Sequence, residues 1–301
     1  MGAAKFLRGL ARKFNQSDLA VVVNTGDDER FYGLHVSPDV DTVIYTLAGV
    51  VNPETGWGLS GETFNALEAL GRLYGKPWFN LGDRDLATHL YRTERLAQGA
   101  TLTQITVELA RRLRVKAEIL PMSDEPARTF VKLKGKSALP FQEYFVRGRA
   151  RGVVEKIELR GAHDARPTAA VLAAIKRARA IVIAPSNPFV SIGPILALAG
   201  VREALAAVRS RVAAISPIVG GKTIKGPADK MMRGLGHEVS PLGVARLYRE
   251  IAGLFVLDVV DHRYIEPVRA LGMRAIATDT IMSDPDRAAA LATVVSRALS
   301  V

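Results

Sequence analysis

The chain has 301 residues, of which 48% are hydrophobic and 24% are charged, a balance that is typical of a globular protein and excludes a disordered one. It contains no cysteine, which excludes disulfides and thiolate metal sites, and no apolar run that could serve as a membrane span or signal peptide, so we expect a cytoplasmic protein without a membrane partner. The formal net charge of +11 invites a nucleic-acid partner, but the cations are spread along predicted helices and the aromatic residues do not interleave with them, so we expect none.

The first half of the chain is predicted to contain two strand regions separated by a helical segment. A helix is expected over 4–14 and a buried strand over 19–24. Between 43 and 120 apolar residues recur at helical spacing, which predicts a helical insert. Strands are expected over 116–121, 127–133 and 153–159, and the alternation in the last two is typical of antiparallel or edge strands.

The rest of the chain alternates strands with helices. Strands are expected over 180–184, 212–215, 253–260 and 274–277, and helices over 167–179, 192–198, 201–208, 243–251, 265–271 and 285–299. This alternation predicts an α/β fold with a doubly wound, mainly parallel sheet. We therefore divide the chain into an α/β body, 1–42 and 121–301, and a small all-helical insert subdomain, 43–120.

Three short acidic motifs lie in the N-terminal part of this otherwise basic chain: Asn24-Thr25-Gly26-Asp27-Asp28, Pro38-Asp39-Val40-Asp41-Thr42 and Gly82-Asp83-Arg84-Asp85. Carboxylates packed this densely around Gly and Pro turns are costly to bring together unless a cation or a sugar ring lies between them. Asp27 and Asp28 follow a predicted parallel strand, at the edge where open α/β sheets hold their ligands. The plain alternative is that these are aspartates in solvent-exposed turns. That alternative could account for a single motif, but it accounts less well for all three together.

Two later loops have the character of anion sites. Residues 184–194 follow a predicted strand and open a helix, so that the amides of 190–192 would face outward, although Ser191 could simply cap that helix. Residues 215–231 repeat the arrangement, with Gly220 and Gly221 permitting close backbone approach and Lys222 and Lys225 supplying charge for a diphosphate.

Taken in order, these segments resemble the 2-phospho-L-lactate transferase (CofD-like) family of coenzyme F420 biosynthesis. Residues 52–58 and 81–89 match further family motifs, and the resemblance covers essentially the whole chain. It implies a Rossmann-like α/β body with a small helical insert, a homodimer, and a transferase. Such an enzyme moves a 2-phospholactyl or phosphoenolpyruvyl group from a guanosine diphosphate (GDP) conjugate to the ribityl chain of the deazaflavin precursor Fo and releases GMP, with magnesium assisting.

The resemblance also implies roles for individual residues. Asp41 and Arg84 are associated with Fo binding, and Asp41 and Asp28 are the expected catalytic carboxylates. We expect Asp27, Asp28 and Asp41 around magnesium, because hard oxygen ligands suit this ion. The wider Fo site and the donor site are assigned as follows: Asp83, His89 and Trp57 with Fo, and Lys5, Ser186, Asn187, Pro188, Ser191, Gly220, Gly221, Lys222 and Lys225 with the donor.

Several of these assignments have alternatives. Asp83 could support Arg84 instead of touching Fo, His89 could make a structural hydrogen bond, and Trp57 could anchor the insert. The whole chain could also be a non-catalytic, nucleotide-sugar-binding regulatory protein of related fold. The motif at 82–85 together with Trp57 favours the transferase, because a pure sensor needs no acceptor site.

One departure concerns the start of the chain. Family members begin with a short strand and a Gly-Gly-x-Gly turn, whereas this sequence begins at the last glycine of that turn, Gly2. We expect the start codon to have been assigned too late; the alternative is that this copy lacks its first strand.

Overall fold

The structure is a computed structural model that describes residues 2–301, and its centre consists of parallel strands. Four of them form one sheet in the order β13 (Arg274–Thr278), β12 (Leu254–Asp258), β9 (Val212–Ile215) and β8 (Ile181–Ile183). A separate parallel pair joins β1 (Ala20–Val23) to β4 (Glu118–Pro121). The expected mainly parallel α/β fold is confirmed, but its sheet is divided into two pieces.

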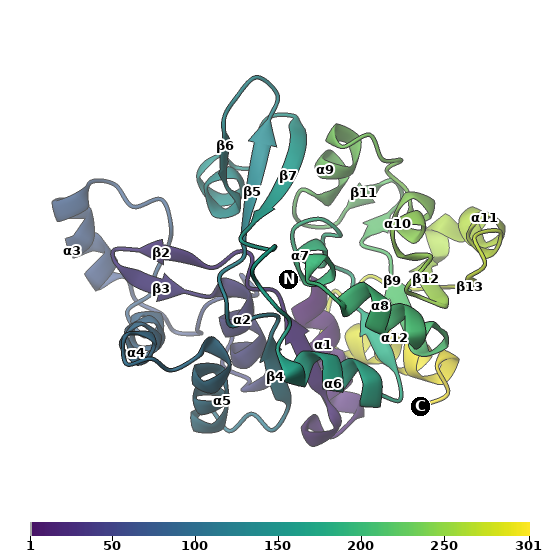
Figure 1. Ribbon diagram of the computed structural model, residues 1–301, viewed down its shortest axis with the longest axis horizontal. Helices are drawn as coiled ribbons and strands as arrows, with labels where there is room; N and C mark the ends of the chain where they lie inside the picture. The colour runs from purple at the N-terminus through teal and green to yellow at the C-terminus, as the bar shows by residue number, and fades with distance from the viewer. Residues whose placement is uncertain (1) are drawn as a thin grey trace.

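Helices cover both faces of the larger sheet, as a doubly wound fold requires (Figure 1). On one face Ala213 and Ile215 of β9 pack against α1 (Gly2–Lys13) and α12 (Pro285–Ala298). On the other face Val212 and Ala214 belong to a hydrophobic cluster to which several other helices contribute. These are α6 (Ala169–Arg177), α8 (Val201–Ala207), α10 (Pro241–Tyr248) and α11 (Ile265–Arg269), with α7 (Gly193–Ala197) beside them. The strict alternation along β9 is what gives the sheet two buried faces.

The segment between β1 and β4 forms the left side of the molecule in Figure 1. It contains α2 (Pro38–Leu47), α3 (Asn65–Tyr74), α4 (Asp85–Ala97) and α5 (Leu102–Arg112), together with a hairpin of β2 (Glu29–Phe31) and β3 (Leu34–Val36). The hairpin was not expected, and its turn places Tyr32 and Gly33 at φ values of 52° and 81°. Both central residues of a tight hairpin turn need positive φ, a conformation that Tyr adopts less readily than Gly.

A third, antiparallel sheet stands at the top of the view in Figure 1, in the order β6 (Ala138–Pro140), β5 (Arg128–Leu133) and β7 (Val154–Arg160). The antiparallel pairing expected for the segments at 127–133 and 153–159 is confirmed. A π-helix, Glu143–Arg147, follows β6. Smaller elements, also not expected, are β10 (Ile218–Val219), β11 (Lys222–Thr223), α9 (Ala228–Gly234) and the 3₁₀ turns Gln16–Asp18, Arg209–Arg211 and Val259–Tyr264.

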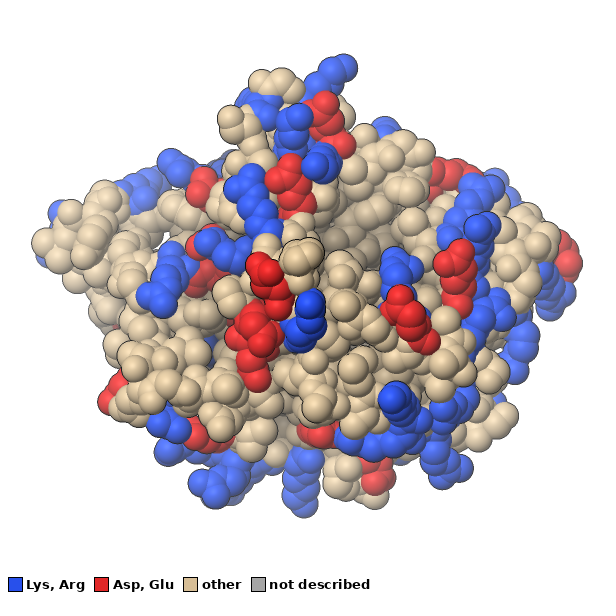
Figure 2. Space-filling model, in the orientation of Figure 1, with Lys and Arg blue, Asp and Glu red and all other residues tan. Residues whose placement is uncertain are grey.

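Within residues 2–301, no helix combines the length and the hydrophobicity needed to cross a membrane. On the face drawn in Figure 2, Lys and Arg side chains are interspersed with Asp and Glu. The positive charge of this face is therefore distributed over it and not confined to one stripe.

Candidate active site

A pocket of about 700 Å³ lies at the edge of the body where the parallel strands end. Pro185 and Ser186 follow β8, Ser216 follows β9 and Thr280 follows β13, and all four line the pocket. Open α/β sheets hold ligands at this edge, because the loops that leave the strands converge there. Of the residues expected at the site, those that line the pocket are Lys5, Asp27, Asp41, Trp57, His89, Ser186, Asn187, Ser191 and Lys225.

The loop after β1 brings Asp27 to this pocket. Asn24 organises the loop, since its Oδ1 accepts from the Gly26 N–H at 2.8 Å and its Nδ2 donates to Asp39 Oδ2 at 2.9 Å. Gly26 is required there, because a Cβ would lie 2.6 Å from Thr129 Oγ1 and 2.9 Å from Asn24 Oδ1. The buried Oδ1 of Asp27 has no hydrogen-bond partner among the described residues.

Asp39 lies beside Asp27 and was not assigned a role from the sequence. It belongs to the first turn of α2 and lines the pocket. Burial raises the pKa of both carboxyl groups, and the charge of Asp39 raises that of Asp27 further, well above its usual value. Two neighbouring carboxylates whose charged forms are disfavoured in this way are suited to a cation between them.

Asp41 stands on the same helix but points to a different set of partners. Residues two apart on a helix do not share a face. Arg92 of α4 donates Nη1 to Asp41 Oδ2 at 3.1 Å and Nη2 to Oδ1, and its side chain is completely buried. Sequence reasoning missed Arg92, because a cation on an amphipathic helix gives no local sign of burial.

His89 and Asp85 continue this polar cluster along α4. His89 Nδ1 lies 3.7 Å from Asp41 Oδ2, and its Nε2 lies 3.4 Å from Asp85 Oδ2. Burial alone would raise the pKa of Asp85, but hydrogen bonding and charge from His89, with help from Tyr45 and Arg92, lower it. Tyr45 donates to Asp85 Oδ1 at 2.6 Å. Asp41, Asp85 and His89 offer ligand atoms that all lie within 4.8 Å of one another. Among residues 2–301, they are the group of three side chains that could together hold a metal ion.

Three charged residues of the acidic motifs, Asp28, Asp83 and Arg84, lie outside the pocket lining. Asp28 Oδ2 instead accepts from Ser37 Oγ at 2.7 Å and lies 3.0 Å from His35 Nε2, so it fixes the approach to α2. Asp83 accepts from the N–H groups of Asn65 and Ala66 at the start of α3, both at 2.9 Å. Arg84 donates from Nη1 to the Ser60 carbonyl at 2.8 Å.

Of the residues expected to bind the donor, some line the pocket and others do not. The start of α1 approaches the loop after β8 so closely that a Cβ on Gly2 would lie 2.1 Å from the Pro185 carbonyl oxygen. Burial first, then the charges of Lys225 and Arg8, lower the pKa of Lys5, which marks a cluster of cations at a helix N-terminus. The expected donor residues outside the lining are Pro188, Gly220, Gly221 and Lys222.

Aromatic side chains form the remaining wall. Phe141 and Phe145, on the β6 side, have ring centroids 5.5 Å apart and nearly parallel planes, and both line the pocket. Trp57, Trp78 and Phe79 line it from the segment between α2 and α4. Of these residues only Trp57 was expected at the site, because the others belong to no recognised motif. Since only 6% of the chain is aromatic, the presence of five aromatic side chains at one pocket indicates a binding surface for a ring. Planar faces of this kind can hold a planar ring.

Comparisons with known proteins agree with this geometry. The family model described as 2-phospho-L-lactate transferase CofD matches residues 1–296. A phosphoenolpyruvate transferase of Streptomyces griseus is 44% identical over 97% of this chain and 93% of its own length. A 2-phospho-L-lactate transferase of Methanosarcina mazei is 37% identical over 99% of this chain and 97% of its own. A solved UPF0052 family structure from Bacillus halodurans, 19% identical, has a TM-score of 0.65 over 98% of this chain and 95% of its own, which supports the fold.

Proposed function

Because the chain belongs to the 2-phospho-L-lactate transferase CofD family and is a transferase, we propose that it moves a phosphoenolpyruvyl or 2-phospholactyl group from a GDP conjugate to the ribityl chain of Fo in coenzyme F420 biosynthesis, releasing GMP. The observation that carries the proposal is one pocket whose lining combines cations, carboxylates and aromatic rings. Lys5 and Lys225, which lie near each other, supply the positive charge that a diphosphate donor needs. Asp27, Asp41 and the aromatic side chains supply what a planar acceptor with a hydroxyl chain needs.

In the proposed reaction the terminal ribityl oxygen bonds to the distal phosphorus of the donor. The bond from that phosphorus to the bridging oxygen breaks, and the bridging oxygen leaves with GMP. Asp41 orients the hydroxyl, since Arg92 holds both Asp41 oxygens in place. As the new bond to phosphorus forms, the hydroxyl becomes more acidic and passes its proton to Asp41. Asp28, proposed from the sequence as a second catalytic carboxylate, acts as a positioning residue through Ser37 and His35.

The pocket suits magnesium at Asp27 and Asp39. The unpartnered, buried Oδ1 of Asp27 and the neighbouring Asp39 carboxylate are hard oxygen ligands, and magnesium often needs only one or two. Asp41 suits it less, because Arg92 already neutralises its charge. The group of Asp41, Asp85 and His89 includes an imidazole, which magnesium disfavours. When bound, the ion would offset negative charge on the transferring phosphoryl group.

Phosphoenolpyruvyl is the first candidate for the transferred group. The chain is 44% identical to a relative named phosphoenolpyruvate transferase and 37% identical to one named 2-phospho-L-lactate transferase. The 2-phospholactyl group remains the second candidate, because that second relative matches 99% of the chain.

The test is to incubate the purified protein with Fo, magnesium and each GDP conjugate separately, and to identify products by mass. We expect Fo to gain the enolpyruvyl phosphate and GMP to appear in equal amount. Turnover with the lactyl conjugate alone would reverse the order of candidates. GDP binding without turnover of either conjugate would favour the regulatory alternative.

Three further assignments belong to this proposal: a homodimer, a cytoplasmic location, and 43–120 as a helical insert subdomain on the body 1–42 and 121–301. The family resemblance supports the first. Sedimentation of the purified protein tests it, with a single species of twice the monomer mass expected.

A further inference from the structure

Asn24 makes hydrogen bonds to three separate segments of the chain. It follows β1 directly, and its side chain is buried. Besides accepting from the Gly26 N–H, it donates from Nδ2 to Asp39 Oδ2 at 2.9 Å and to the Val190 carbonyl at 3.2 Å. A side-chain amide nitrogen carries two hydrogens, so these two bonds use its full donor capacity. One side chain thus connects the loop after β1, the first turn of α2 and the loop after β8.

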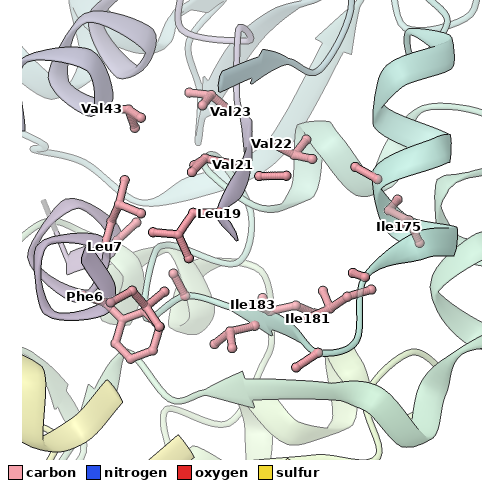
Figure 3. Close-up of a pocket in the computed structure, with 18 of the residues that line it drawn as sticks. Phe6, Leu7, Leu19, Val21, Val22, Val23, Val43, Ile175, Ile181 and Ile183 are labelled. Carbon is pink, nitrogen blue, oxygen red and sulfur yellow. The ribbon is translucent and has the colours of Figure 1, made fainter. Parts of the chain in front are cut away.

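The strands that lead to the first and the last of these segments lie apart. β1 pairs with β4, and β8 pairs with β9. Figure 3 shows the apolar side chains of 21–23 opposite those of Ile181 and Ile183, across the space between the two strands. Apolar contacts have no direction, so they do not fix how one loop stands relative to the other. The bond from Asn24 to Val190 is directional and joins the two loops where the strands end.

Val190 belongs to two walls of the pocket at once. Its N–H lies in a turn that Asn187 closes, with 3.4 Å from Val190 N to Asn187 Oδ1. Asn187 and Ser191, on either side of it in the chain, line the pocket. The Val190 side chain is buried in the cluster that contains Phe141, against which Phe145 packs. A shift of the Val190 backbone would therefore move both the expected donor loop and part of the aromatic wall.

The other donor bond acts on Asp39, a proposed magnesium ligand. Burial raises the pKa of Asp39, and the hydrogen bond from Asn24 opposes this rise by stabilising the charged carboxylate. Because this bond engages Oδ2, it also restricts the orientation of the carboxylate and leaves Oδ1 for an ion. Removal of such a partner behind a metal ligand typically lowers metal affinity by about 10- to 100-fold.

We propose that Asn24 is a positioning residue that orients Asp39 for magnesium and at the same time fixes the donor loop at Val190, so that the ion and the donor are held in one relative position. This inference rests on the proposed function, which names the ion and the donor. The plain alternative is that Asn24 only closes the local turn at Gly26. That turn needs one acceptor oxygen, which Ser also supplies, whereas the two donor bonds need an amide.

The test is Asn24→Ser, which keeps an oxygen for the Gly26 N–H but is too short to donate to both distant partners. Magnesium binding is measured by calorimetry without GDP, and GDP binding is measured without magnesium, so that neither ligand influences the other. We expect the dissociation constant of magnesium to rise by about tenfold or more. The dissociation constant of GDP should rise by about three- to tenfold, which corresponds to the loss of one neutral hydrogen bond.

Gln16→Ser is the matched control. Gln16 also connects distant segments through its amide, because Nε2 donates to the Leu47 carbonyl at 2.9 Å and Oε1 accepts from the Lys116 N–H at 3.1 Å. It lies outside the pocket lining. This variant should lower the melting temperature and leave both affinities unchanged. If Asn24→Ser behaves in the same way, Asn24 is only a structural residue and the proposal is wrong.

A double variant separates the two roles of Asn24. If Asn24 acts on magnesium through Asp39, Asn24→Ser should weaken magnesium binding much less in an Asp39→Asn background than in the parent. Its effect on GDP should be the same in both backgrounds, because that effect passes through Val190. Additive losses for magnesium, or loss of only one of the two affinities in Asn24→Ser, would overturn the proposal. A parent chain that binds neither ligand would contradict the proposed function, and this inference with it.

A measurement on the unaltered chain covers the case in which Asn24→Ser does not fold. Magnesium alone should slow amide hydrogen exchange at 189–192 by about fivefold or more, because the ion immobilises Asp39 and, through Asn24, the loop at Val190. Unchanged exchange at 189–192 in saturating magnesium would contradict the proposal.

Discussion

Arg92 and Asp41, 51 residues apart in the chain, meet as a buried ion pair. Burial alone would lower the pKa of Arg92, but the charge and hydrogen bonds of Asp41 outweigh it and raise that pKa. The pair joins α4 to α2 and fixes the direction in which Asp41 faces the pocket. It is therefore both a structural contact and a part of the proposed site.

Breaking this pair should destabilise the protein strongly. Arg92→Met and Asp41→Asn should each lower the free energy of unfolding by about 3–5 kcal/mol, because each leaves a buried polar group of its partner uncompensated. The double variant should lose clearly less than the two losses together, as measured by urea denaturation. Arg95→Met, which breaks the partly exposed pair with Glu108, serves as a control with a much smaller effect. Additive losses would mean that the two residues do not depend on each other.

Asp41→Asn should also reduce turnover by about a hundredfold or more if Asp41 serves the attacking hydroxyl. The assay is run below the melting temperature of the variant, so that unfolding does not contribute. Asp28 lies outside the pocket lining. Asp28→Asn should therefore affect KM or stability more than it affects turnover. Near-normal turnover of folded Asp41→Asn would remove Asp41 from the mechanism.

Magnesium binding should depend on Asp27 and Asp39 and much less on Asp28. We expect Asp27→Asn and Asp39→Asn to raise the magnesium concentration for half-maximal turnover by about tenfold or more, since each removes a proposed ligand. The raised pKa of Asp27 means that protons compete with the ion, so affinity should fall as the pH is lowered toward that pKa. Titration calorimetry should show a flatter pH profile for Asp27→Asn. An unchanged profile would place the ion elsewhere.

The body of the fold could be predicted from the sequence because its strands are local apolar runs. Residues 254–257 are buried from both faces, and 21–23 are three consecutive valines of which Val23 is buried and the other two are partly buried, so hydrophobicity alone indicates both strands. The hairpin β2–β3 could not be found in this way, because its strands have three residues each and its turn uses Tyr32 instead of an Asn-Gly pair.

The site was predictable at the level of motifs and not of individual contacts. The motif at 38–42 was recognised, but which of its two aspartates faces which partner depends on helix geometry and on Arg92, far away in the chain. Asp83 and Arg84 lie in an equally good motif, yet their hydrogen bonds are made to 60–66. Such partners are set by tertiary packing, which a single sequence does not reveal.

Donor binding should distinguish the lysines that line the pocket from one that does not. Lys5→Met and Lys225→Met should each weaken GDP binding by roughly 10- to 100-fold, the value of a hydrogen bond to a charged group. Lys222→Met is the matched control, because Lys222 lies in the same loop as Lys225 but outside the lining, and it should bind GDP almost normally. Calorimetric titration with GDP measures all three. A large loss with Lys222→Met alone would move the diphosphate toward the loop at 220–222.

Asp83 should matter for the stability of the helical segment more than for Fo. Hydrogen bonds from Thr63, then from the backbone of Ala66, lower the pKa of Asp83 to about 2. Its unfolded-state pKa is about 3.9, so the stabilisation is fully present above that pH and is lost as the pH falls toward 2. Asp83→Ala should therefore have a lower melting temperature than the parent at pH 5 to 7, and this difference should vanish near pH 2. The control is Asp164→Ala, a change at an exposed position, which should melt at the same temperature as the parent. The KM for Fo should change little, because Asp83 lies outside the pocket lining. A large rise in that KM at unchanged melting temperature would instead place Asp83 in the acceptor site.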